Sequence, residues 1–286
     1  MLAAVHSRAS GSYGHCVGDV GRGDEKPTYE RVIEDLAAEH DALDDVVAGL
    51  DDTGWSTPTP AQGWDVRDSI AHLAYSEELA ATATTDPDAF ALRLADLVAN
   101  IETTESDLVA QGRSISGPEV LGWWRRTRAR TLEGLRGHDA RDRLPWIAGP
   151  MSAMSFGTAR MMETWAHGQD VVDGLGVGRP ATERLRHICE LCVQTRRHSY
   201  FVRGRDMPDG DVEVELSVDD GVVWSWGASA TDSIRGPALD FCLVCTQRRN
   251  PADTALEVTG PLACEWIDHA QAFAGAATDQ RPASQG

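Results

Sequence analysis

The residues best suited by type and spacing to bind a metal or take part in a reaction lie in the stretch ARMMETWAHGQDVVDGLG, residues 159–176. Glu163, His167 and Asp170 occupy positions i, i+4 and i+7, so a helix would place all three on one face. A carboxylate and an imidazole are both side-chain groups that bind zinc, and at this spacing they could bind the same ion. A zinc site would need at least one more ligand from elsewhere in the chain. The alternative is the polar face of an ordinary helix, with Arg160 as the partner of Glu163.

Spacing alone does not decide between these two interpretations. An acid stands four residues before a histidine at three further places: Asp68/His72, Glu183/His187 and Glu265/His269. The setting of Glu163 and His167 is more informative, because Met161, Met162 and Trp165 surround them and no lysine is near. A helix that is apolar on most sides is buried, and a buried acid needs a partner. This setting favours a metal.

His72 is the best candidate for the third ligand. It lies in the middle of an apolar helical segment beside Leu73, and a helical bundle can direct it at the facing helix. Two histidines and one carboxylate with an open position make a catalytic zinc site, or an Fe(II) or nickel site. Asp170 and Gln169 would then orient the ligands or contact a substrate. A histidine packed in the core without any metal is the alternative.

The cysteines offer a rival metal site. Cys189-x-x-Cys192 and Cys242-x-x-Cys245 resemble the halves of a structural zinc module. Both pairs lie in apolar runs and lack the glycine-rich turn that lets thiolates converge, so we favour buried, reduced core cysteines. The chain contains no Walker loop, dinucleotide-binding fingerprint, HExxH or G-x-S-x-G motif.

Helices must position the candidate ligands, because helical periodicity fills the first part of the chain. Asp65 is a suitable N-cap for the helix that carries His72, with Asp68 in its first turn, and Ser152 for the helix that carries Glu163. The pattern predicts an antiparallel helical bundle without strands before about residue 178 and a loop at 137–151. The expected helices cover residues 28–50, 66–83, 87–109, 118–135 and 152–174.

The pattern changes after Pro180. The alternation of Val212 to Val218, an Asp-Asp-Gly turn and the alternation of Val222 to Trp226 predict a β-hairpin. The remaining elements complete a small α+β domain. They are a helix at 182–200, a helix at 237–248, a short strand at 255–260 and a helix at 261–273.

Charge and composition narrow the partners. The formal net charge of −19 argues against nucleic acid and an anionic membrane, since both would repel the chain. No apolar run approaches the ~20 residues of a membrane-spanning helix. Residues 1–27 lack a basic segment leading into an apolar one, so we expect a disordered leader there and a cytoplasmic protein. Residues 279–286 are expected to be a disordered tail.

Three quoted stretches together resemble one family. TPTPAQGWDVRDSIAHLA, ARMMETWAHGQDVVDGLGV and GPALDFCLVCTQRR are similar to the mycothiol-dependent maleylpyruvate isomerase-like proteins of actinobacteria, within the DinB-like metal-binding superfamily. The resemblance implies a four-helix bundle at 28–180 followed by a sterol-carrier-like α+β domain at 181–278. It also implies one divalent ion, usually zinc, held by His72, Glu163 and His167.

The same resemblance implies a functional arginine after the helix of the second domain. Arg248 is the nearest match and Arg249 its neighbour, although the chain has TQRR where the family usually has GR. Arg248 would hold a carboxylate of the substrate, with the two-pronged geometry that arginine provides. Asp170 would orient His167 or contact the thiol.

Three functions remain open at this point. The first is a metal-dependent thiol transferase or isomerase, in which the metal activates a low-molecular-weight thiol such as mycothiol for attack on a small electrophile. The second is a hydrolase that uses metal-bound hydroxide. The third is a non-enzymatic protein that binds an apolar small molecule. The sequence does not fix the oligomeric state, and a homodimer stays open.

Overall fold

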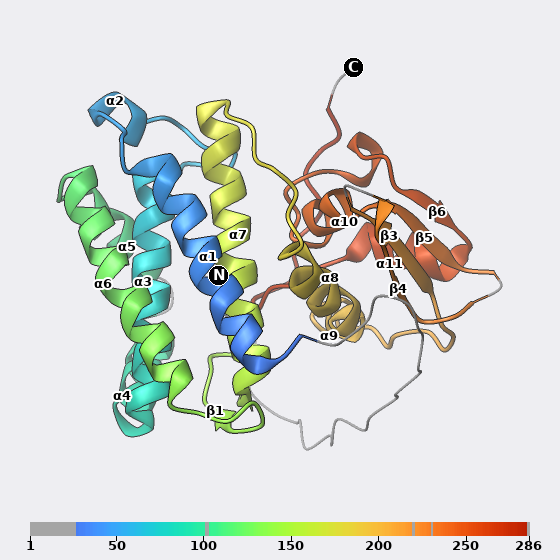
Figure 1. Cartoon of the computed structure of the whole chain (residues 1–286), viewed down its shortest axis with the longest axis horizontal. Coiled ribbons are helices and arrows are strands. Elements are labelled where there is room, and N and C mark those ends of the chain that lie inside the picture. The colour runs from blue at the N-terminus through green and yellow to red at the C-terminus, as the bar shows by residue number, and fades with distance from the viewer. Residues whose placement is uncertain (1–26, 101–102, 219–220, 230, 285–286) are drawn as a thin grey trace. The chain divides into compact units, whose positions relative to one another are not determined.

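The computed structural model describes residues 27–100, 103–218, 221–229 and 231–284 of the chain. The described chain divides into an N-terminal unit, Pro27–Pro180, and a C-terminal unit that begins at Ala181 (Figure 1). The N-terminal unit is almost wholly helical and the smaller C-terminal unit contains a sheet, so the α+β prediction is confirmed. The expected leader falls on residues 1–26, outside the described residues. Among the described helices, none is long and apolar enough to cross a membrane.

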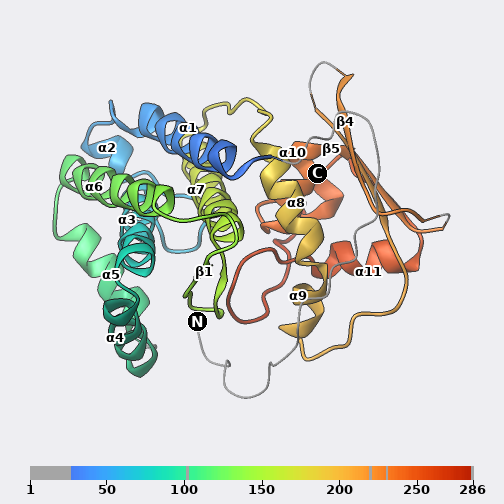
Figure 2. The ribbon, with the colours of Figure 1, turned by 60° about the horizontal axis from the view of Figure 1, so that its bottom comes forward.

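The N-terminal unit is built around the long helices α1, α3, α6 and α7 (Figures 1 and 2). Both α1 and α3 pack against both α6 and α7, so that these helices occupy the corners of a bundle. Shorter elements complete the unit. The elements in chain order are α1 (Tyr29–Val47), α2 (Asp52–Trp55), α3 (Val66–Thr85), α4 (Pro87–Ala99), α5 (Thr104–Arg113), α6 (Gly117–Arg136), β1 (Arg143–Leu144), β2 (Met151–Ser152) and α7 (Ala153–Leu175).

Helix starts follow the sequence signals closely. Asp65 caps α3 in a capping box: its side chain accepts from the Asp68 N–H at 2.9 Å, and the Asp68 carboxylate accepts from the Asp65 N–H at 3.0 Å. Ser152 caps α7 by accepting from the N–H of Ser155. At the other end, α7 stops at Gly176, whose φ of 65° lies in the left-handed region that favours glycine.

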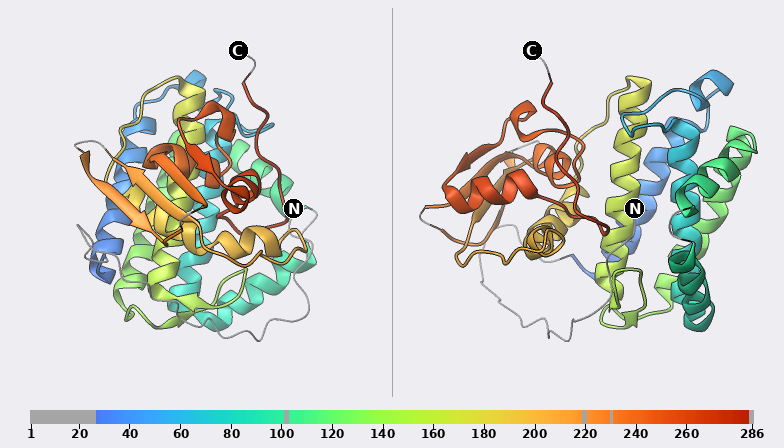
Figure 3. Two further views of the ribbon diagram at one scale, coloured as in Figure 1. Left: turned by 90° about the vertical axis from the view of Figure 1, so that its right-hand side faces the viewer. Right: turned by 180° about the vertical axis from the view of Figure 1, so that it is seen from behind.

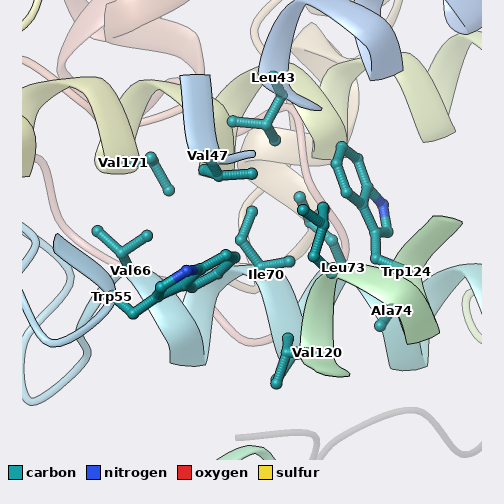
Figure 4. Packing of buried hydrophobic residues seen from close by; sticks show 12 residues of the cluster. Leu43, Val47, Trp55, Val66, Ile70, Leu73, Ala74, Val120, Trp124 and Val171 are labelled. Atoms are coloured by element: carbon teal, nitrogen blue, oxygen red, sulfur yellow. The ribbon is translucent and has the colours of Figure 1, made fainter. Parts of the chain in front are cut away.

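The core of the bundle lies between these helices. Trp55 and Trp124 are almost fully buried against residues of α1, α3 and α7 such as Val47, Ile70 and Val171 (Figure 4). Burial of apolar side chains of this size is worth about 1.5–3 kcal/mol each. The hydrophobic contacts therefore fix the relative positions of α3 and α7, the two helices that carry the candidate ligands.

The N-terminal unit differs from the sequence prediction in two places. The helix expected over 87–109 is broken into α4 and α5. At the end of α4, the Asn100 carbonyl oxygen accepts hydrogen bonds from the backbone N–H groups of Thr103 and Thr104. The expected loop at 137–151 contains the antiparallel pair β1 and β2, in which Leu144 lies opposite Met151. A two-residue strand leaves no periodicity in the sequence, which explains why it was missed.

The C-terminal unit combines helices with a sheet (Figure 3). The order of the strands in this sheet is β4-β3-β5-β6. β3 and β4 form the predicted antiparallel hairpin, with Leu216 opposite Trp224, and two residues of its expected turn, 219–220, lie outside the described residues. The elements are α8 (Leu185–Gln194), α9 (Arg196–Phe201), β3 (Glu213–Ser217), β4 (Val223–Trp226), β5 (Ser233–Pro237), α10 (Ala238–Cys245), η2 (Pro251–Asp253), β6 (Glu257–Thr259) and α11 (Pro261–His269).

Two features of this unit were not predicted. The helix expected over 182–200 is divided at Thr195 into α8 and α9. β5 was not predicted, and it pairs parallel with β3 and antiparallel with β6. Its sequence, SIRGP, has one large apolar residue and ends in Gly-Pro, so it lacks the alternation that marks a strand. Only the pairing of distant segments makes it part of a sheet.

Candidate metal centre

His72 of α3 and Glu163 and His167 of α7 meet within the N-terminal unit. His72 Nε2 lies 3.8 Å and His167 Nε2 lies 3.7 Å from the same oxygen, Glu163 Oε2. One ligand atom from each of the three residues lies within 4.8 Å of the others, and no other such group of His, Cys, Asp or Glu occurs in the described part of the chain. The structure therefore brings together the three side chains that the sequence singled out.

The two separations from Glu163 Oε2 fit a single divalent cation. Ligand atoms about 2.1 Å from one zinc ion in a tetrahedron are about 3.4 Å apart, and they cannot be more than about 4.2 Å apart. The distances of 3.7 and 3.8 Å from the two imidazole nitrogens to this oxygen fall within this range. The donor set of two imidazoles and one carboxylate is that of catalytic zinc sites and of some iron sites. Exposed fractions of 30% for His72 and 21% for Glu163 leave the site open to small molecules.

The electrostatics keep the carboxylate ionised. Burial by itself raises the pKa of Glu163, but the electrostatic influence of the nearby His72, Arg160 and His167 side chains outweighs this effect. The pKa of Glu163 consequently lies well below its usual range. An ionised carboxylate is the form in which this side chain binds a cation.

Arg160 does not take the role of a simple ion-pair partner for Glu163. Its guanidinium donates a hydrogen bond to the Ser76 hydroxyl and lies 4.5 Å above the ring of Trp146. The arginine is nearly fully buried, and its charge acts on Glu163 through space. The carboxylate oxygen of Glu163 instead faces the two histidines, as a ligand set requires.

Asp170 lies behind His167 on the same helix. Its Oδ2 atom is 3.7 Å from His167 Nδ1, and its side chain is only 1% exposed. A carboxylate at the rear nitrogen of an imidazole can fix the orientation of the ring and leave the other nitrogen for a metal. The neighbouring Gln169 instead donates to Asp173 at 2.9 Å, one turn further along the helix.

Trp64 completes the surroundings of the site and was not among the predicted residues. Its ring centroid lies 5.3 Å from that of His72 and 5.8 Å from that of His167, and it is nearly parallel to the latter ring with an angle of 20°. The two imidazoles themselves are 4.4 Å apart. Trp64 lies in the loop before α3, so no helical periodicity connects it with His72. Two sequence signals were available: its position directly before the N-cap Asp65, and its place in the stretch TPTPAQGWDVRDSIAHLA, which carries the family resemblance.

Arg248 belongs to the C-terminal unit, in the segment that follows α10. Its Nη1 donates to the carbonyl oxygen of Thr246 at 2.6 Å, and its own carbonyl oxygen accepts from Arg249 at 2.8 Å. The predicted contact between Arg248 and a substrate carboxylate remains a prediction.

The cysteine pairs meet side by side in the C-terminal unit. Cys189 of α8 and Cys242 of α10 have sulfur atoms 3.4 Å apart, and the Cys192 thiol interacts with that of Cys245. All four are free and buried. Burial raises the pKa of these thiols at Cys189, Cys242 and Cys245, so they remain protonated and unreactive. This arrangement supports the interpretation as core cysteines.

Comparison with known proteins identifies the relatives of the chain. The family described as the mycothiol maleylpyruvate isomerase N-terminal domain matches residues 36–172. Uncharacterized proteins from two strains of Mycobacterium tuberculosis are each 43% identical over 244 residues, which cover 85% of this chain and 95% of theirs.

Two solved structures have a similar fold. A crystal structure of the mycothiol-dependent maleylpyruvate isomerase has a TM-score of 0.54 at 13% identity, covering 82% of this chain and 95% of that one. A histidine-to-alanine mutant of that enzyme has a TM-score of 0.52 at 13% identity, with coverage of 78% and 92%. At such low identity, the likeness establishes the fold.

Proposed function

Because the chain belongs to the mycothiol-dependent maleylpyruvate isomerase-like family, we propose that it is a metal-dependent thiol transferase or isomerase. Its thiol would be a low-molecular-weight compound such as mycothiol, and its second substrate a small electrophile. The observation that carries the proposal is the convergence of His72, Glu163 and His167 from two helices. Family membership supports the thiol, and the donor set supports the metal.

Zinc is the ion that this donor set suits best, with His72, Glu163 and His167 as its ligands. When bound, zinc would lower the pKa of a thiol at its open position and so provide a thiolate at neutral pH. The partial exposure of His72 and Glu163 leaves an approach for the thiol and the electrophile.

The chain's own residues contribute orientation and charge. Glu163 supplies a negative charge beside the two imidazoles, which binding of a divalent cation requires. Asp170, whose Oδ2 atom lies 3.7 Å from His167 Nδ1, would orient the ring so that Nε2 faces Glu163. In the C-terminal unit, Arg248 is the proposed contact for a carboxylate of the substrate.

The proposal is tested by metal content and by thiol-dependent turnover. The purified full-length protein is expected to contain about one zinc per chain, and His72→Ala and Glu163→Gln are expected to lose it. Turnover is measured with maleylpyruvate as the first electrophile, with and without mycothiol. His138→Ala is the matched control, because His138 is bound to the Thr84 carbonyl oxygen away from the site. Metal and activity should survive this change.

The outcomes separate the alternatives. Activity that survives His72→Ala after the metal is lost would refute metal dependence. Turnover that does not need a thiol would favour hydrolysis. A folded parent protein without metal, even after incubation with zinc, would favour a non-enzymatic binding protein.

A further inference from the structure

Trp64 contacts both candidate histidine ligands. Its ring is tilted by 48° against His72 and lies nearly parallel to His167, at centroid distances typical of aromatic pairs. The two imidazoles come from different helices, α3 and α7. One indole ring therefore restricts the orientation of both.

The loop that carries Trp64 is closed by its own hydrogen bonds. The Trp64 carbonyl oxygen accepts from the Thr59 N–H at 2.9 Å and from the Thr59 hydroxyl at 3.1 Å, and the Trp64 N–H donates to Ala61 at 3.0 Å. Pro58 pairs with Asp65 in an isolated β-bridge. Both backbone polar groups of Trp64 are thus bound within the loop, which fixes the base of its side chain.

Contacts with the neighbouring helices fix the loop as a whole. Arg113 of α5 donates to the Gly63 carbonyl oxygen at 3.0 Å and binds Asp68 in the first turn of α3. On α7, Gly174 lets the loop approach closely, because a Cβ atom there would stand 2.7 Å from the Pro58 carbonyl oxygen. The loop is therefore held against both ligand-bearing helices.

We propose that Trp64 is a positioning residue for the metal centre, which holds the rings of His72 and His167 in the orientation that ligation requires. This inference rests on the proposed function, because it assumes that these histidines bind a metal. Residues that orient ligands typically change metal affinity ten- to a hundredfold when they are mutated. In addition, the electron-rich face of the indole favours the positive charge that the imidazoles gain on ligation.

The test uses the full-length protein, stripped of metal and titrated with zinc against a competing chelator. Trp64→Ala is expected to weaken zinc binding ten- to a hundredfold. Trp64→Phe keeps an aromatic ring and should restore most of the affinity. The second measurement is indole emission, which zinc should change in the parent protein and no longer change in Trp64→Phe.

Trp123→Phe is the matched control. Trp123 is also partly buried. It lies on α6, which carries none of the candidate ligands, and its Nε1 atom donates to Glu78 Oε2 at 3.3 Å. Trp123→Phe should bind zinc like the parent protein and retain the emission change. Should Trp64→Ala fail to fold, Trp64→Phe still tests the proposal through the emission signal.

The results distinguish this inference from the function on which it rests. Zinc affinity in folded Trp64→Ala equal to that of the parent protein, or an emission change that persists in Trp64→Phe, would overturn the role of Trp64. If His72→Ala still abolishes zinc binding in that case, the proposed function stands. A parent protein that does not bind zinc would overturn both.

Discussion

Replacement of Asp170 by asparagine tests how strongly the residue behind His167 supports metal binding. The substitution keeps the shape of the side chain and removes its charge. Opposite unit charges at the separation of 3.7 Å attract by about 4.5 kcal/mol at an effective dielectric constant of about 20. This energy is an upper limit for the contribution of Asp170, because a ligated imidazole carries only part of a positive charge. We therefore expect a loss of about 1.4–2.7 kcal/mol, which is ten- to a hundredfold in zinc affinity.

The assay is zinc titration of the metal-free protein against a competing chelator near neutral pH. Asp173→Asn is the control, since Asp173 is three residues further along α7 and accepts from Gln169. We expect this control to bind zinc like the parent protein. An Asp170→Asn variant that folds and binds zinc within about twofold of the parent would refute the orienting role of Asp170.

Three further predictions concern the framework of the N-terminal unit. Asp68→Ala removes the capping box of α3 and the bond from Arg113 Nη2 at 2.6 Å, so urea unfolding should show a loss of about 1–3 kcal/mol; no loss would contradict the capping role. Gly174→Ala places a Cβ atom 2.7 Å from the Pro58 carbonyl oxygen and should destabilise the protein by about 1–3 kcal/mol, whereas an unchanged melting temperature would mean that the loop moves freely. Burial raises the pKa of Tyr29 to about 12 from 10.0, so the neutral phenol stabilises the fold below pH 10 and this contribution is lost as the pH rises toward 12. Tyr29→Phe should remove that part of the pH dependence in alkaline denaturation, and an unchanged profile would disprove the assignment.

The predicted site residues show how far local patterns reach. Helical spacing indicated that Glu163, His167 and Asp170 share one face of a helix, and the structure places them on α7 as expected. His72 was chosen because it lies in an apolar helix, and the structure brings it to 3.8 Å from Glu163. Their role as metal ligands remains a proposal. The spacing did not show that Arg160 turns to Ser76 instead of Glu163.

Other features could not be read from the sequence because they depend on distant contacts. Trp64 lies in a loop, where no periodicity predicts the direction of a side chain. The strand β5 has little strand character of its own and forms by pairing with β3, about 20 residues away in the chain. The break between α4 and α5 falls in a segment whose helical pattern continued without interruption.

The sequence by itself indicated the long helices α1, α3, α6 and α7, the caps of α3 and α7, and the helix face that carries Glu163, His167 and Asp170, because these follow from interactions between residues at most a turn or two apart. The tertiary structure alone decided which side chains of different segments meet. His72 reaches Glu163 across 91 positions of the chain, and Trp64 reaches His167 across 103. Such contacts depend on how whole helices pack and on the entropy of closing the chain between them, and neither leaves a local pattern in the sequence.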